Sequence, residues 1–172
     1  SFVYQPANYR YDFAAKALAP FGSSERRIDS AEYETTQVWY PSKDGTKVSM
    51  FLVHRKGLAP DGRRPVLLTG YGGFNISLTP SFDPANFVLI DKGGIYAVAN
   101  LRGGGEYGEA WHEAGMFERK QNVFDDFIAA AEWLGASDAT LYRFPFARFE
   151  SGVEVEGPPK NMLGLGILCR IL

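Results

Sequence analysis

Two short apolar runs in this chain each end in a cluster of glycines. The first run is 66–70 (VLLTG), followed by Tyr71 and two more glycines; the second is 95–101 (IYAVANL), followed by RGGGEYG. Short runs that are apolar throughout are typical of strands buried on both faces of a sheet. An amphipathic helix is predicted over 120–134, because apolar residues recur there every three or four positions. The sequence therefore predicts an α/β fold with a mostly parallel sheet and flanking helices.

Both glycine clusters are expected at the edge of the sheet where parallel strands have their carboxyl ends. Ligands of α/β proteins bind at that edge. The first cluster holds one bulky polar side chain, Tyr71, among glycines that relieve a crowded or left-handed backbone. The residues alone leave two interpretations open. Either this is a tight turn with a packing aromatic ring, or it is a loop that offers the Tyr71 hydroxyl to a bound group.

The remaining segments carry weaker structural signals. A β-hairpin is predicted over 33–55, because Asp44 and the glycine after it form a strong turn signal between two β-rich runs. Another hairpin is predicted within 1–13, and a short helix between 83 and 94. The tail, 135–172, has no sustained period and is broken by prolines, so we expect it to be a poor source of further strands.

Composition excludes several classes of function. The net charge of −2 over 172 residues gives no general attraction to nucleic acid or to anionic membranes. The single cysteine, Cys169, excludes an internal disulfide and a zinc cluster of thiolates, and it fits a cytoplasmic protein. No apolar stretch approaches the roughly 20 residues that span a bilayer. The chain starts without methionine and without a signal-peptide pattern, so we expect that it was cut from a longer protein.

Three longer segments resemble a known family. They are QVWYPSKDGTKVSMFLVHRKG (37–57), GYGGFNISLTPSF (70–82) and AVANLRGGGEYGEAWHEAGMFERKQNVFDDFIAAAEWL (97–134). In this order they resemble, nearly without gaps, the first half of the catalytic domain of the prolyl oligopeptidase family. The resemblance extends over about 34–134, and the tail does not share it.

The resemblance implies a partial α/β-hydrolase fold, preceded by strands from the end of a β-propeller. The implied domains are the end of the propeller and a linker over 1–32, and the N-terminal half of the peptidase domain over 33–134. Residues 135–172 stay unassigned. The implied activity is hydrolysis of prolyl peptide bonds in short peptides, by acyl transfer with a Ser-Asp-His triad and without a metal or cofactor.

The resemblance also implies roles for residues of the two glycine clusters. Tyr71 corresponds to the family's oxyanion-hole donor, and Phe74 to a residue that lines the proline pocket. A donor placed where negative charge develops stabilises the transition state. Further residues are expected in structural loops near this site: Gly70, Gly72, Gly73, Asn75, Arg102 and Glu106. Of these, Arg102 and Glu106 are expected to form internal ion pairs.

The catalytic triad is not found in this sequence. The family's nucleophile lies on a Gly-x-Ser-x-Gly elbow, and no such stretch occurs among the 172 residues. The family's aspartate and histidine follow later still, and neither His54 nor His112 matches the catalytic histidine. We therefore expect the chain alone to be inactive and to need the rest of the peptidase domain. The alternative hypothesis is a non-catalytic pseudo-enzyme or protein-interaction module.

Other polar residues are interpreted as structural. His112 is expected to be a hydrogen-bonded structural histidine rather than a metal ligand, and His54 a surface residue at a strand end. Asp125 and Asp126 are interpreted as residues of a first helical turn, where the helix dipole favours negative charge. The glycine cluster RGGGEYG is interpreted as a structural loop at the end of a strand rather than as a phosphate-binding loop.

Overall fold

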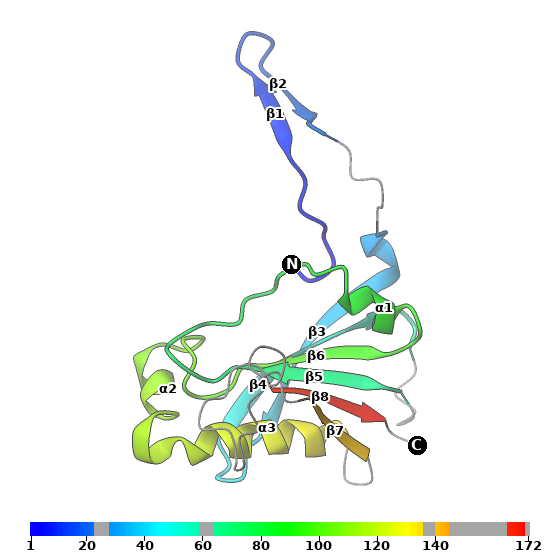
Figure 1. Ribbon diagram of the computed structural model, residues 1–172. Helices are drawn as coiled ribbons and strands as arrows, with labels where there is room; N and C mark the ends of the chain where they lie inside the picture. The colour runs from blue at the N-terminus through cyan, green and yellow to red at the C-terminus, as the bar shows by residue number, and fades with distance from the viewer. Residues whose placement is uncertain (23–27, 59–63, 136–139, 145–164, 171–172) are drawn as a thin grey trace, which may run out of the picture.

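The computed structural model describes residues 1–22, 28–58, 64–135, 140–144 and 165–170. A six-stranded sheet in the order β3-β4-β6-β5-β8-β7 forms its centre (Figure 1). The strands are β3 (Tyr33–Pro41), β4 (Lys47–Arg55), β5 (Val66–Gly70), β6 (Ile95–Ala99), β7 (Thr140–Phe144) and β8 (Leu165–Arg170). The shorter elements are a two-stranded hairpin of β1 (Tyr9–Asp12) and β2 (Ala17–Pro20), and the 3-10 turns η1 (Ser30–Glu32) and η2 (Phe117–Arg119).

The sheet is mixed rather than mostly parallel. Among the described strands, β5 and β6 pair in parallel, and the other four pairs of the sheet are antiparallel. The prediction of an α/β fold is confirmed, but the prediction of a mostly parallel sheet is wrong for these strands. The hairpin of β3 and β4 and the strands of the tail both add antiparallel neighbours to the parallel pair.

The hairpin of β3 and β4 forms as its turn signal predicts. Gly45 takes a left-handed conformation with φ +82°, which glycine adopts without steric cost. The Asp44 carboxylate accepts the Thr46 N–H at 3.0 Å, and the Ser42 N–H donates to the Thr46 carbonyl at 2.8 Å. These contacts fix the register of the two long strands.

The tail supplies two strands, contrary to our expectation from its irregular sequence. Strand β8 pairs antiparallel with β5, and β7 pairs with β8. The sequence signal failed here because β pairing uses backbone N–H and C=O groups. An extended segment can therefore pair with a free strand edge without a regular side-chain period.

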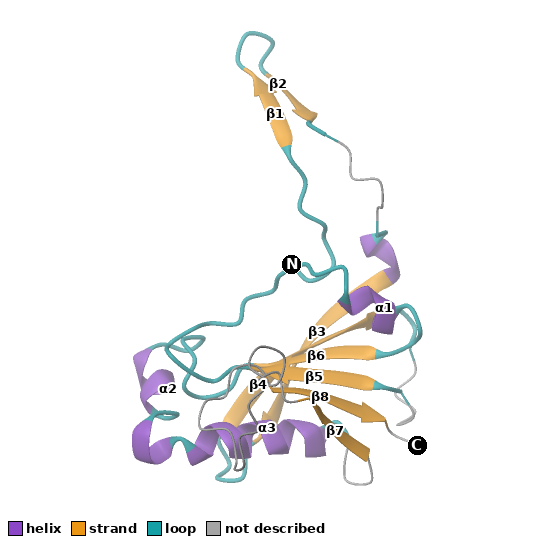
Figure 2. Ribbon diagram, viewed as in Figure 1, coloured by secondary structure: helices purple, strands orange, loops and turns teal. Residues whose placement is uncertain are grey.

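Helices cover both faces of the sheet (Figure 2). On one face, α3 (Gln121–Trp133) packs through Val123, Phe127 and Ala130 against residues of β4, β5 and β6. On the other face, α1 (Asn86–Ile90) packs through Phe87 and Ile90. A further short helix, α2 (Glu109–Glu113), follows the second glycine cluster. Among the described residues, no helix combines the length and the apolar character that crossing a bilayer requires.

The two predicted helices are present. The helix predicted over 120–134 is α3. The short helix predicted between 83 and 94 is α1. The Asp83 carboxylate accepts the Ala85 N–H just before it, and the Gly94 N–H donates to the Leu89 carbonyl at its end.

The hairpin predicted within 1–13 does not form. Phe2 and Val3 are buried instead, and the Phe2 ring lies 5.5 Å from the ring of Phe51 and 6.2 Å from that of Tyr96. Burial of an apolar aromatic ring outweighs local strand propensity at this position. The observed hairpin, β1 with β2, lies later in the chain and projects away from the sheet (Figure 2).

Candidate functional site

The two glycine clusters are neighbours at one edge of the sheet. Strands β5 and β6 run in parallel with Gly70 opposite Ala99, so the segments that follow them leave the sheet side by side. We name the first segment, 70–79, the tyrosine loop and the second, 102–108, the glycine-rich loop. The Asn75 N–H in the tyrosine loop donates to the Gly103 carbonyl at 3.2 Å. The eight predicted site residues therefore lie on two loops that contact each other: Gly70, Tyr71, Gly72, Gly73, Phe74, Asn75, Arg102 and Glu106.

The two loops approach each other more closely than side chains would allow. Gly72 has φ +60°, and a Cβ atom there would lie 2.4 Å from the Val123 Cγ1 atom and 2.9 Å from the Arg102 carbonyl oxygen. Gly103 has φ +90°, and its Cβ would lie 2.7 Å from the Gly72 carbonyl oxygen. Both positions need glycine for its conformation and for its lack of a side chain.

Tyr71 and Phe74 differ in exposure. The Tyr71 side chain is half-buried, whereas Phe74 is 80% exposed, and their ring centroids are 6.4 Å apart. Phe74 and Asn75 both have positive φ values, 53° and 55°. Left-handed backbone is tolerated by asparagine but is uncommon for a bulky residue such as phenylalanine. The loop therefore holds an apolar ring in solvent at the cost of backbone strain, and such strain concentrates at functional sites.

Glu106 supports the tyrosine loop by a different contact from the one predicted. Its Oε1 atom accepts the Leu78 N–H at 2.8 Å. Its Oε2 atom is buried and has no hydrogen-bond partner among the described residues. Burial raises the pKa of this carboxyl group above its usual value. Among the described residues no cation pairs with Glu106, and a backbone N–H of the neighbouring loop contacts its carboxylate instead.

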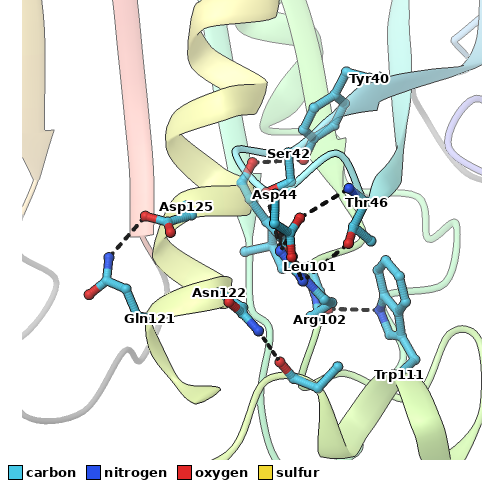
Figure 3. Close-up of polar contacts among 12 residues, drawn as sticks. Tyr40, Ser42, Asp44, Thr46, Leu101, Arg102, Trp111, Gln121, Asn122 and Asp125 are labelled. Atoms are coloured by element: carbon cyan, nitrogen blue, oxygen red, sulfur yellow. Dashed lines mark hydrogen bonds and ion pairs between the residues drawn. The ribbon is translucent and has the colours of Figure 1, made fainter. Parts of the chain in front are cut away.

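Arg102 forms the predicted ion pairs (Figure 3). Its side chain is 5% exposed, and its Nη2 atom lies 2.6 Å from Oδ1 of Asp126, whose side chain is fully buried. Its Nη1 atom lies 2.6 Å from Oδ2 of Asp44, which lies in the turn between β3 and β4. The guanidinium also donates to the hydroxyls of Ser42 at 3.2 Å and Thr46 at 3.3 Å. One side chain thus joins the glycine-rich loop, the β3–β4 turn and helix α3.

The interpretation of Asp126 as a first-turn residue is wrong. Helix α3 begins at Gln121, so Asp126 lies in its second turn, and its carboxylate accepts both the side chain and the backbone N–H of Arg102. Asp125 also lies beyond the first turn and accepts the Gln121 side-chain amide at 3.0 Å. The sequence did contain a signal for Asp126. It stands on the apolar face of the helix, three residues after Val123, where a carboxylate needs a buried partner.

The Asp44 carboxylate predicts a pH-dependent stability. The hydrogen bond from Arg102 lowers the pKa of Asp44 to about 2 in the folded chain. Because this pKa is depressed relative to the unfolded chain, near 3.9, the contribution to stability is present above about pH 4 and is lost as the pH falls toward 2. Urea unfolding at a series of pH values measures it. Asp44→Asn is expected to flatten this part of the profile, while the exposed control Glu118→Gln leaves it unchanged. An equally steep decline in Asp44→Asn would contradict this assignment.

The two histidines have structural contacts. The Nδ1 atom of His112 lies 2.8 Å from the Gly103 carbonyl oxygen, as expected for a hydrogen-bonded structural residue. The side chain of His54 is only 13% exposed, and its Nε2 atom lies 3.5 Å from Glu34. His54 does lie at the end of its strand, but its side chain is largely covered rather than on the surface. Within the described residues, no group of three or more His, Cys, Asp or Glu residues could hold a metal ion.

A cavity of about 480 Å³ lies away from the tyrosine loop. It is lined by residues of the N-terminal segment and the β1–β2 hairpin, among them Tyr4, Tyr9 and Phe21. It shares no residue with the two loops at the carboxyl edge of the sheet. The candidate site is therefore defined by those loops and not by this cavity.

Comparison with known proteins finds similarity to prolyl oligopeptidases and prolyl endopeptidases. Residues 80–142 match the prolyl oligopeptidase family. The prolyl endopeptidase of Elizabethkingia meningoseptica is 44% identical over 134 residues, which cover 78% of this chain and 19% of that protein. The prolyl endopeptidase of Dictyostelium discoideum is 55% identical over 108 residues, which cover 61% of this chain and 14% of that protein.

Solved structures have the same arrangement. A structure from a study of two prolyl endopeptidases superposes with a TM-score of 0.69 at 50% identity, over 78% of this chain and 20% of that one. Prolyl oligopeptidase B from Galerina marginata, bound to a 25-residue macrocyclization substrate, gives a TM-score of 0.68 at 43% identity. The match covers 77% of this chain and 19% of that one. The described residues thus form part of an α/β-hydrolase fold, and the chain spans about a fifth of the length of these relatives. On its sequence and its structure, the chain belongs to the prolyl oligopeptidase family.

Proposed function

We propose that this chain is part of a serine peptidase that hydrolyses prolyl peptide bonds in short peptides. The observation that carries the proposal is the position of the tyrosine loop. Tyr71 directly follows β5 at the carboxyl edge of the parallel pair of strands, where α/β proteins bind their ligands. Its neighbour Phe74 presents an exposed ring on the same loop.

In this proposal Tyr71 stabilises the oxyanion of acyl transfer. A serine supplied from outside these 172 residues attacks the scissile carbonyl, and the carbonyl oxygen gains negative charge as its double bond opens. The Tyr71 hydroxyl donates a hydrogen bond to that oxygen. Such a donor, held in place before the reaction, stabilises the transition state more than the substrate. Phe74 contacts the proline ring, for which an exposed aromatic side chain is a suitable apolar partner.

The proposal extends to domains and location. The β1–β2 hairpin, within 1–32, is assigned to the end of a propeller and its linker, which is supported by its projection from the sheet (Figure 1). Residues 33–134 are assigned to the first half of the peptidase domain. The substrates are short proline-containing peptides, and no cofactor is required. The single cysteine, Cys169, excludes an internal disulfide and supports a cytoplasmic location.

The function is tested with the chain and with a chimera. The chain alone is incubated with a chromogenic peptide that ends in proline and with a serine-directed covalent probe; we expect neither turnover nor labelling. In the chimera, residues 33–134 replace the corresponding segment of the Dictyostelium prolyl endopeptidase, which then supplies the triad. We expect this chimera to cleave the peptide. Turnover by the chain alone, or a folded chimera without activity, would overturn the proposal.

A further inference from the structure

Lys120 reaches from the start of helix α3 to the tyrosine loop. Its Nζ atom donates to the Gly72 carbonyl oxygen at 2.8 Å. The side chain is partly buried, and this burial lowers the pKa of the ammonium group. Within the part of the chain that the structure describes, no carboxylate forms an ion pair with it. Removing a cation from water without a counter-ion costs free energy. The hydrogen bond from Lys120 to the Gly72 carbonyl offsets this cost.

The Gly72 carbonyl belongs to the residue that directly follows Tyr71. The direction of this carbonyl is therefore coupled to the backbone from which the phenol ring projects. Gly72 is also confined by Val123 and by the Arg102 carbonyl, which leave no room for a side chain at this position. The peptide is thus both closely packed and hydrogen-bonded by Lys120.

The ammonium group and the phenol ring both lie close to Gly73. A Cβ atom at Gly73 would lie 3.8 Å from the Lys120 Nζ atom and 3.8 Å from the Tyr71 Cε1 atom. Both groups thus flank the same point of the loop. At the far end of the loop, the Asn75 and Leu78 N–H groups donate to Gly103 and to Glu106. Lys120 is the anchor at the end that carries Tyr71.

We propose that Lys120 is a positioning residue for Tyr71: its ammonium group holds the Gly72 carbonyl and thereby fixes the loop that presents the phenol. The proposal rests on the function proposed above for Tyr71. It assigns Lys120 no contact with substrate. Its effect is to remove the conformational freedom that glycines at 70, 72 and 73 would otherwise give to the loop.

Amide hydrogen exchange of the full chain, measured by NMR, tests this role. In Lys120→Met, which keeps the length of the side chain but loses its donors, the Asn75 and Leu78 amides are expected to exchange about tenfold faster. The Tyr71 ring resonances are expected to move at the same time. Lys120→Arg, which can still donate to the Gly72 carbonyl, is expected to restore both signals. Lys92→Met, at an exposed lysine beyond α1, is the matched control and is expected to change neither.

Three outcomes would overturn the proposal. The first is an unchanged loop in Lys120→Met, and the second is an equal acceleration of amides in β3 and β4, which would indicate global destabilisation. The third is a failure of Lys120→Arg to restore the signals, because a hydrogen bond to the Gly72 carbonyl would then not be what fixes the loop. A separate measurement in the chimera distinguishes this proposal from the function. A loosened loop with unchanged kcat would support Lys120 as the anchor and contradict the oxyanion role of Tyr71.

Discussion

Replacing Arg102 by methionine is expected to lower the free energy of unfolding by about 3–5 kcal/mol, the cost of leaving a buried charge without its partner. Asp126 is fully buried, and Arg102 supplies both its ion pair and a backbone hydrogen bond. Removing the guanidinium leaves the Asp126 carboxylate in the core without its ion pair. From residue 102 it then keeps only the hydrogen bond of the backbone N–H. Domains of this size are stable by about 5–15 kcal/mol, so the loss is a large part of the total.

Urea unfolding of the full chain measures this loss. Arg119→Met, at an exposed arginine just before α3, is the control and is expected to change the free energy of unfolding by less than about 0.5 kcal/mol. Adding Asp126→Leu to Arg102→Met removes the unpaired charge and is expected to recover part of the stability. Equal stability of the Arg102 and Arg119 variants would show that the network contributes little.

Replacing Tyr71 by phenylalanine in the chimera is expected to lower kcat by about 10²–10³-fold, as found when one oxyanion donor is removed from a serine peptidase. The substitution keeps the ring and removes only the hydroxyl. In the proposed function the hydroxyl contacts charge that develops only in the transition state, so KM is expected to change little. Steady-state kinetics with a chromogenic proline peptide give both constants.

The matched control is Tyr33→Phe. The Tyr33 hydroxyl donates to Asp91 at 2.6 Å, and its ring packs on Phe87, on the face of the sheet covered by α1. Tyr33→Phe therefore removes a phenol hydroxyl, as Tyr71→Phe does, but away from the tyrosine loop. We expect it to preserve kcat. If Tyr71→Phe also preserved kcat, or raised KM alone, the tyrosine would not act on the oxyanion.

Local signals in the sequence predicted the elements around the candidate site. The turn at Asp44, the apolar runs before the glycine clusters and the period of α3 each depend on neighbours within a few residues. Such patterns follow from the geometry of strands and helices alone. The side-by-side position of the two glycine loops then followed from one rule about parallel strands, which β5 and β6 fit.

Contacts between distant segments were predicted less well. Burial of Phe2 against Phe51 displaced the first hairpin, and the pairing of β8 with β5 added strands that no side-chain pattern indicated. The contact between Lys120 and Gly72 joins residues 48 positions apart and had no signal in the sequence. Local propensity contributes less to stability than burial and pairing across the fold, so these features became visible only in three dimensions.

The position of Arg102 sets a limit on how this site can change. The residue that begins the glycine-rich loop is bonded to the core through its side chain and its peptide group. This end of the loop cannot open without the loss of contacts that stabilise the whole domain, so it belongs to the same cooperative unfolding unit as α3. In the proposed peptidase, adaptation to a different peptide is therefore left to outward-facing positions such as Phe74, which is 80% exposed and lies outside the core.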